Sequence, residues 1–249
     1  IFIFSFIYMF VGKDFTQPKI DQVEENSPAY ISGLKPNDII LSINKNKINS
    51  ILEVSAHINS STSDEIDLTI LRNNEEMYFS VRPNIIDSKD TLGNNLKKKV
   101  IGIKITALNN EIKKEKLGPA KALFYASKET WFVTKTSLKF IVSLFQGKGD
   151  TTQLGGPIKI AKITGQVSQY GFIAFLSITA YISISLGLIN LFPIPMLDGG
   201  HLMFYAFEKI LGRPLKQRTQ EGFSRIGLFL LFSLMFFTTF NDLKDIGLF

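Results

Sequence analysis

The feature that most constrains this chain is an uncharged apolar run from Gly171 to Phe192, which ends in Pro193-Ile-Pro-Met-Leu-Asp-Gly-Gly200. An α-helix needs about 20 apolar residues to cross a bilayer. The prolines must stop that helix, because they lack the N–H that a helical hydrogen bond needs. An ionisable group at membrane depth costs about 2.5–3.5 kcal/mol on insertion scales, so Asp198 is a candidate functional residue.

The alternative for Asp198 is a solvated position in a turn at the membrane surface. Irregular backbone near membrane depth is tolerated mainly where it lines a protein cavity. The Pro-Ile-Pro break therefore favours the buried position. Gly199 and Gly200, which follow Asp198, allow other backbone to approach closely.

The composition indicates an α-helical integral membrane protein with a soluble insert. Hydrophobic residues make up 45% of the 249 residues, Phe occurs 22 times, and a second apolar run spans Ile226–Phe240. The net charge of +6 comes from scattered basic residues without interleaved aromatic residues, which indicates membrane topology and no nucleic-acid partner. The chain has no Cys, which excludes disulfides and thiolate metal sites.

The first third of the chain is expected to contain a helix end and one soluble domain. Residues 1–12 are apolar up to Val11 but too few to span a bilayer, so they are expected to end a transmembrane helix that starts upstream. Residues 16–85 are expected to form a compact domain, because alternating apolar residues are typical of half-buried strands. The predicted elements are strands over Pro18–Val23 and Ile39–Ile43, a helix over 50–60, and a hairpin of Glu65–Leu71 and Met77–Val81.

The remaining boundaries follow from polar stretches between apolar ones. Residues 86–118 are polar apart from a strand-like segment, Val100–Ile105, so they are expected to be a linker or adaptor. The segments that follow are an amphipathic helix over 119–146, a connector over 147–170, a transmembrane helix with its turn over 171–201, a loop over 202–225 and a transmembrane helix over 226–245. A helical stretch is expected around Leu202–Leu211, at the start of that loop.

The helix over 119–146 carries Lys121, Lys128 and Lys135 at intervals of seven residues, opposite an aromatic-rich face that includes Trp131. Basic residues beside a wide apolar face are typical of a helix that lies in the membrane interface. The alternative is an ordinary amphipathic helix packed on the soluble domain. The wide apolar face and the membrane span that follows favour the interface.

Basic residues in short loops predict the topology, because cytoplasmic loops are enriched in Lys and Arg. The segment between the two spans contains Lys209, Arg213, Lys216, Arg218 and Arg225. The outer flanks offer Lys159, Lys162 and Lys244. The 202–225 loop is therefore expected in the cytoplasm. The soluble domain and the C-terminus are expected on the other side, which is the periplasm in a bacterium with two membranes.

Three stretches of the chain carry specific motifs: Glu25–Asn44, Leu154–Ala161 and Asn190–Leu202. The first is similar to the signature of a PDZ domain, with Asn37 in place of the usual Gly before Asp38. The second is similar to the stretch before the third span of the site-2 protease family, and the third to that family's Asn-Pro and Leu-Asp-Gly motifs. Together they resemble the bacterial regulator-of-sigma-E protease branch through nearly the whole chain, with one PDZ-like domain over 16–85.

The resemblance implies an intramembrane zinc metalloprotease that performs regulated intramembrane proteolysis in the bacterial inner membrane. Its implied partners are the lipid bilayer and single-span membrane substrates, such as anti-sigma factors or signal-peptide remnants. Asp198 would be the third protein ligand of Zn2+, and Asn190 would support the tetrahedral oxyanion. This agrees with zinc chemistry, because a catalytic zinc has three protein ligands and an open position for water.

The chain departs from the family in its histidines. The family's two imidazole ligands and its general base lie in a His-Glu-x-x-His helix, whereas the only histidines here are His57 and His201. The intact surroundings of Asp198 favour missing upstream sequence over a degenerate enzyme, and the 249 residues alone are expected to be inactive. His201 is expected to be a hydrogen-bonding side chain, and His57 to lie on a polar helix face.

Two other functions stay open. A non-catalytic membrane scaffold would use the PDZ-like domain to capture C-terminal peptides by strand addition. Half of a transporter would explain a helix broken at its midplane, but not the PDZ signature. A His-Glu-x-x-His motif encoded upstream of Ile1 would identify the protease, and its absence would favour the scaffold.

Overall fold

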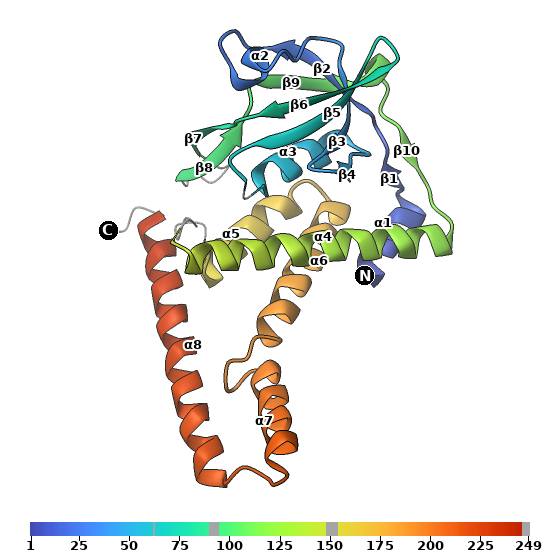
Figure 1. The fold of residues 1–249 in the computed structure, drawn as a ribbon. Coiled ribbons are helices and arrows are strands. Elements are labelled where there is room, and N and C mark those ends of the chain that lie inside the picture. The colour runs from blue at the N-terminus through green and yellow to red at the C-terminus, as the bar shows by residue number, and fades with distance from the viewer. Residues whose placement is uncertain (62, 90–94, 148–153, 246–249) are drawn as a thin grey trace. The chain divides into compact units, whose positions relative to one another are not determined.

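A computed structural model describes residues 1–61, 63–89, 95–147 and 154–245 (Figure 1). Contacts divide the chain into two units. The first unit consists of Phe2–Ser127 and Lys139–Gly149, and the second of Lys128–Leu138, Asp150–Phe249 and Ile1. The long helix α4 (Pro119–Phe145) therefore contributes to both units.

The first unit is built on a six-stranded antiparallel sheet (Figure 1). Five strands follow the order β6-β5-β3-β2-β9, and β4 (Asn46–Lys47) pairs with β3. The five are β2 (Pro18–Val23), β3 (Ile39–Ile43), β5 (Ile66–Arg72), β6 (Glu75–Val81) and β9 (Ile103–Ala107). The strands predicted between residues 18 and 81 are thus present, and the predicted hairpin is formed by β5 and β6.

Alternation and turn chemistry explain this hairpin. Ile66, Leu68 and Ile70 are buried at every second position of β5, as expected for a strand with one face on the core. The loop between the strands is Asn73-Asn74, and both residues have positive φ, 51° and 66°. Positive φ at both central residues defines the type I′ turn, and Asn is one of the residues that tolerate it.

Two helices complete the domain around the sheet. The predicted helix over 50–60 is present as α3 (Ile51–Asn59), and its Val54 and Ile58 are buried in the core. The short α2 (Pro28–Ile31) starts with the hydroxyl of Ser27 accepting from the Tyr30 N–H. The rest of the core comes mainly from the sheet and its flanking turns: Ile20, Leu34, Ile40, Ile43, Ile48, Ile66, Leu68, Ile70, Val81 and Ile101.

The prediction that residues 86–118 form a linker is wrong. β7 (Asn84–Lys89) and β8 (Asn95–Val100) form a hairpin, and β9 is the strand next to β2 in the main sheet. Ile101 is 2% exposed in the core, so this segment completes the domain. The single strand predicted over Val100–Ile105 is divided at Gly102, whose φ is +77°. β9 pairs with β2, which lies 80 to 89 positions earlier, and local periodicity carries no information about such a distant partner.

The first unit also contains the chain's N-terminal helix. α1 (Phe2–Phe10) forms where a helix end was expected, and Phe4, Ile7 and Tyr8 are buried. β1 (Lys13–Asp14) follows it and pairs with β10 (Lys114–Glu115). This two-stranded ribbon leads into α4.

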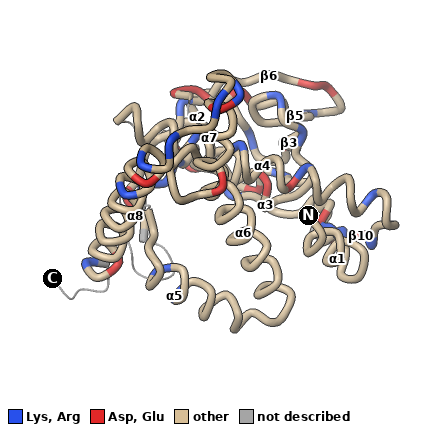
Figure 2. Tube along the Cα trace, turned by 90° about the horizontal axis from the view of Figure 1, so that it is seen from below, with Lys and Arg blue, Asp and Glu red and all other residues tan. Residues whose placement is uncertain are grey.

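The second unit is helical: α5 (Pro157–Ser168), α6 (Phe172–Asn190), α7 (Asp198–Leu211) and α8 (Gln217–Asp245). Within the described residues, α6 and α8 are the helices long and apolar enough to cross a membrane, judged by length and composition. Figure 2 shows no charged residue along α6. The predicted helical stretch around Leu202–Leu211 is present in α7. Two boundaries need correction, because the connector over 147–170 contains α5 and α8 already begins at Gln217, within the predicted 202–225 loop. Pro157 at the first helical position explains the start of α5, since its fixed φ suits that position.

Candidate active site

The break predicted after the apolar run lies between α6 and α7. α6 ends at Asn190, and α7 begins at Asp198. The intervening turn is held by its own backbone, with the Ile194 N–H donating to the Phe192 carbonyl at 2.7 Å and the Leu197 N–H to the Ile194 carbonyl at 3.0 Å. Met196 has a φ of 87°, which is uncommon for a residue other than glycine. Such a conformation persists only where its surroundings fix it.

Three glycines pack the surrounding helices tightly onto this turn. Gly199 and Gly200 are buried in the first turn of α7, and a Cβ on either would overlap backbone carbonyls of the turn. Gly227 of α8 is buried as well, and a Cβ there would overlap the carbonyl group of Pro195. The turn is therefore held between α7 and α8, which explains why glycine follows Asp198.

The two predicted site residues stand at opposite ends of the turn. Asn190 is the last residue of α6, Asp198 is the first of α7, and both side chains are exposed. A carboxylate in the first turn of a helix is favoured by the partial positive charge of the helix N-terminus. The location of both residues fits a site at the break, and their chemical roles stay predictions.

The donor set around Asp198 fits one metal ligand and no more. Across the described ranges, no three His, Asp or Glu side chains come close enough together to hold a metal ion. A catalytic zinc needs three protein ligands. His201 is exposed, and its ring packs edge-on against Phe204, with centroids 6.2 Å apart and planes at 83°. In the part of the chain that the structure describes, Asp198 is therefore not joined by the further ligands that a catalytic zinc needs.

His57 belongs to the other unit and lies on α3. It is half-buried, so the prediction of a polar helix face is wrong in part. Burial lowers the pKa of His57; Glu53 opposes this shift, and Lys139 adds to it. His57 is thus a packed side chain of the first unit.

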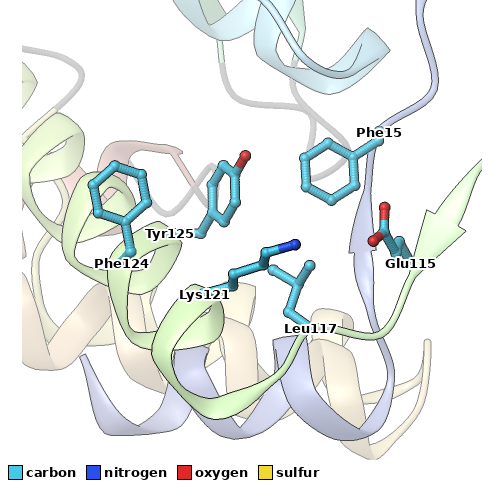
Figure 3. A pocket seen from close by; sticks show the side chains of 6 residues that line it. All are labelled: Phe15, Glu115, Leu117, Lys121, Phe124 and Tyr125. Carbon is cyan, nitrogen blue, oxygen red and sulfur yellow. The ribbon is translucent and has the colours of Figure 1, made fainter.

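One pocket also lies in the first unit (Figure 3). Its volume is about 340 Å³, and its lining residues are Phe15, Glu115, Leu117, Lys121, Phe124 and Tyr125. The rings of Phe15 and Tyr125 pack edge to face, with their centroids 5.3 Å apart. None of these residues was predicted to belong to the site.

Sequence reasoning missed Asp242, the most buried carboxylate among the described residues of the second unit. Asp242, in the last turn of α8, is 1% exposed and accepts two backbone hydrogen bonds from the start of α5. The sequence does contain a signal for this residue, because Asp242 is an ionisable side chain just past the apolar run Ile226–Phe240. The reasoning that singled out Asp198 applies to it equally.

Comparison with known proteins identifies the family of the chain. The sequence profile of Peptidase family M50 matches residues 1–234. A relative in Agrobacterium fabrum, named as a zinc metalloprotease, is 34% identical over 246 residues, which cover 99% of this chain and 65% of the relative. A Campylobacter jejuni protein of the same name is 36% identical and matches 97% of this chain and 65% of its own length.

The Regulator of sigma-E protease RseP of Salmonella typhimurium is 33% identical over 227 residues, covering 91% of this chain and half of that protein. Among solved structures, a PDZ domain of an SdrC-like protein from Listeria monocytogenes covers 36% of this chain at 20% identity and a TM-score of 0.29. The sequence relatives, and not this weak structural likeness, identify the family. The chain spans about two thirds of the length of the Agrobacterium and Campylobacter relatives.

Proposed function

This chain belongs to peptidase family M50, the site-2 protease family, and we propose that the full-length protein is a zinc metalloprotease that cleaves single-span membrane proteins within the bilayer. The observation that carries the proposal is the packed break between α6 and α7. It puts the carboxylate of Asp198 just past the apolar helix α6. An ionisable group at membrane depth has a large desolvation cost, so its presence there indicates a functional residue.

Asp198 is the proposed metal ligand of this chain. A carboxylate is an accepted zinc ligand, and Asp198 lies at the break where irregular backbone can line a cavity. The family's other ligands lie in a His-Glu-x-x-His segment, which these 249 residues do not contain. We infer that such a segment of the full-length protein completes the donor set. Asn190, at the other end of the turn, is the proposed hydrogen-bond donor to the oxyanion.

The proposed location is the bacterial inner membrane, with α6 and α8 as spanning helices. The family is membrane-embedded, and both helices have the length and composition of membrane spans. The basic residues between them favour a cytoplasmic α7–α8 loop. The PDZ-like domain then lies on the periplasmic side, where it would restrict the access of substrates with bulky external domains.

A further proposed partner is the membrane surface, bound by α4. Phe124, Trp131 and Phe145 of this helix are 56%, 67% and 87% exposed. Lys121, Lys128 and Lys135 are exposed as well. Trp131 is three and four positions from Lys128 and Lys135, so these lysines share its helix face and do not lie opposite it as predicted. Large apolar side chains exposed along one face next to lysines are typical of a helix in the membrane interface. This pattern supports the interface over packing of the whole helix on the soluble domain.

Cleavage by the full-length protein in proteoliposomes tests the proposal. The substrate is a labelled single-span membrane protein with a short external segment, and the product is detected by gel and mass spectrometry. Asp198→Asn should abolish cleavage and leave membrane insertion unchanged, because it removes an anionic oxygen ligand. Glu221→Gln, which neutralises an exposed carboxylate of α8, is the matched control and should cleave normally. Near-normal cleavage by Asp198→Asn contradicts the proposal.

A membrane scaffold is the second candidate, favoured by one observation in the first unit. Within the described residues, β9 is an edge strand of the main sheet, and α3 contacts it. An edge strand presents backbone groups that can pair with an extended peptide. A full-length protein that binds C-terminal peptides but leaves single-span substrates intact would identify the scaffold.

A further inference from the structure

The carboxylate of Asp242 caps a helix that is not its own. Asp242 lies in the last turn of α8, with 1% of its surface exposed. Its Oδ1 accepts a hydrogen bond from the Gly156 N–H at 2.8 Å, and its Oδ2 accepts one from the Lys159 N–H at 2.9 Å. Gly156 is the N-cap residue of α5, and Lys159 is its third helical residue.

These two bonds reproduce a capping box with atoms from another helix. In an ordinary capping box, the N-cap side chain accepts from the third N–H, and the third side chain accepts from the N-cap N–H. Gly156 has no side chain with which to cap α5. One buried carboxylate therefore satisfies both donors, and its negative charge is favoured at the positive end of the helix.

The close approach of α8 explains why residue 156 is glycine. A Cβ on Gly156 would lie 2.6 Å from Oδ2 of Asp242 and 2.9 Å from the carbonyl carbon of Thr238. Backbone of α8 cannot move aside as the end of a flexible side chain can. The Gly-Gly-Pro stretch at the start of α5 is thus shaped to receive α8.

The same helix packs on the candidate site at its other end. Gly227 of α8 lies against the carbonyl of Pro195, three residues before Asp198. Gly227 and Asp242 are 15 positions apart, which corresponds to about 22 Å along a helix. α8 is therefore bound to both ends of the segment Gly156–Pro195, which contains α5 and α6.

We propose that Asp242 is a positioning residue for the intramembrane site. Asp242 fixes the start of α5 on α8, and α6 follows α5 in the chain. It therefore sets the position of α6 along α8, and with it the point at which the turn before Asp198 contacts Gly227. Asp242 touches neither substrate nor metal in this role. The inference rests on the proposed protease function for its kinetic consequence, but not for its structural one.

The test uses the full-length protein with a single cysteine at position 196, any other cysteines being replaced. Asp242→Asn keeps the size of the side chain but replaces one acceptor oxygen with an NH2 group, so it loses one hydrogen bond and opposes a donor. We expect kcat for the single-span substrate to fall by about tenfold or more, with KM nearly unchanged, because substrate contacts are not altered. Alkylation of the cysteine in Met196→Cys should become several-fold faster, because the turn is no longer held in one position.

Gly156→Ala disrupts the same contact from the side of α5. It should also lower kcat and speed the alkylation of the cysteine at position 196. Lys244→Gln removes an exposed charge two residues from Asp242 and should change neither. The proposal is overturned if both Asp242→Asn and Gly156→Ala keep the wild-type kcat. It is also overturned if both keep the wild-type alkylation rate. Equal effects from Lys244→Gln overturn it as well. If the unmodified protein cleaves nothing, the proposed protease function fails, and the alkylation rates still decide the role of Asp242.

Discussion

The Nζ atom of Lys13 lies 3.1 Å from Oε1 of Glu53, and together they join the N-terminal ribbon to α3 of the sheet domain. Lys13 is 8% exposed, and its ammonium group also lies 5.4–5.9 Å from the ring centroids of Tyr8, Phe15 and Tyr125. A buried ammonium is stable only with such partners. This contact is a charged link between elements that are far apart in the sequence.

Replacing Lys13 should loosen this link. Lys13→Met keeps the length of the side chain but leaves the Glu53 carboxylate without its cation, which should cost about 1–3 kcal/mol of local stability. Hydrogen exchange of the α3 and β10 amides measures the loss. Lys47→Met, at an exposed position, is the control. The double variant with Glu53→Gln should recover part of the loss, and fully additive effects would show that the pair is not coupled.

His57 should make the first unit less stable in mild acid. Its pKa is lowered mainly by burial, so the folded state favours the neutral imidazole more than the unfolded state does. Neutral His57 therefore makes its full contribution to the stability of the folded state above the unfolded pKa of about 6.5. This stability is lost as pH falls below that value. Melting curves between pH 5 and 8 should show this loss in the wild type and less of it in His57→Gln. Parallel pH profiles would assign the dependence to other groups.

Gly227→Ala should disturb the turn before Asp198, because its new methyl group overlaps the Pro195 carbonyl. Overpacking of this kind costs about 1–3 kcal/mol. We expect slower cleavage by the full-length protein and faster alkylation of a cysteine at position 196. Gly222→Ala is the matched control, because nothing lies within 4 Å of a Cβ at that helical position. Equal activity of the two variants would mean that α8 does not hold the turn.

What the sequence predicts here depends on whether the signal is local. The strands up to Val81 follow from alternation, and the break after α6 follows from its prolines. Asn37 in place of the usual glycine is also explained locally, since its φ is 73° and Asn is among the residues that tolerate positive φ.

Long-range contacts are the part that the sequence does not predict. Arg72 donates two hydrogen bonds of 2.7 Å to Asp38, which is 1% exposed and 34 positions away. Asp242 and Gly156 are 86 positions apart. Neither pair has a periodic or motif-like signal that links its two members. The pairing of β9 with β2 is missed for the same reason.

Thiol labelling should decide the topology, because these residues contain no native Cys. A cysteine at Gln217, the first residue of α8, should be shielded from an impermeant reagent added to intact cells. A cysteine at Asn74, in the turn between β5 and β6, should react once the outer membrane is permeabilised. The opposite pattern would put the PDZ-like domain in the cytoplasm and overturn the orientation.

A protein made of these 249 residues should bind no tight stoichiometric zinc and cleave no substrate. Three protein ligands are needed, and Asp198 is the single residue here with the family's ligand motif. His201 adds little, because its ring already packs on Phe204, and one carboxylate leaves the ion largely hydrated and exchangeable. Metal analysis after dialysis against a mild chelator measures the bound zinc. One zinc retained per chain would mean that His201 or other groups complete a site with Asp198, and that the donor set has been assigned wrongly.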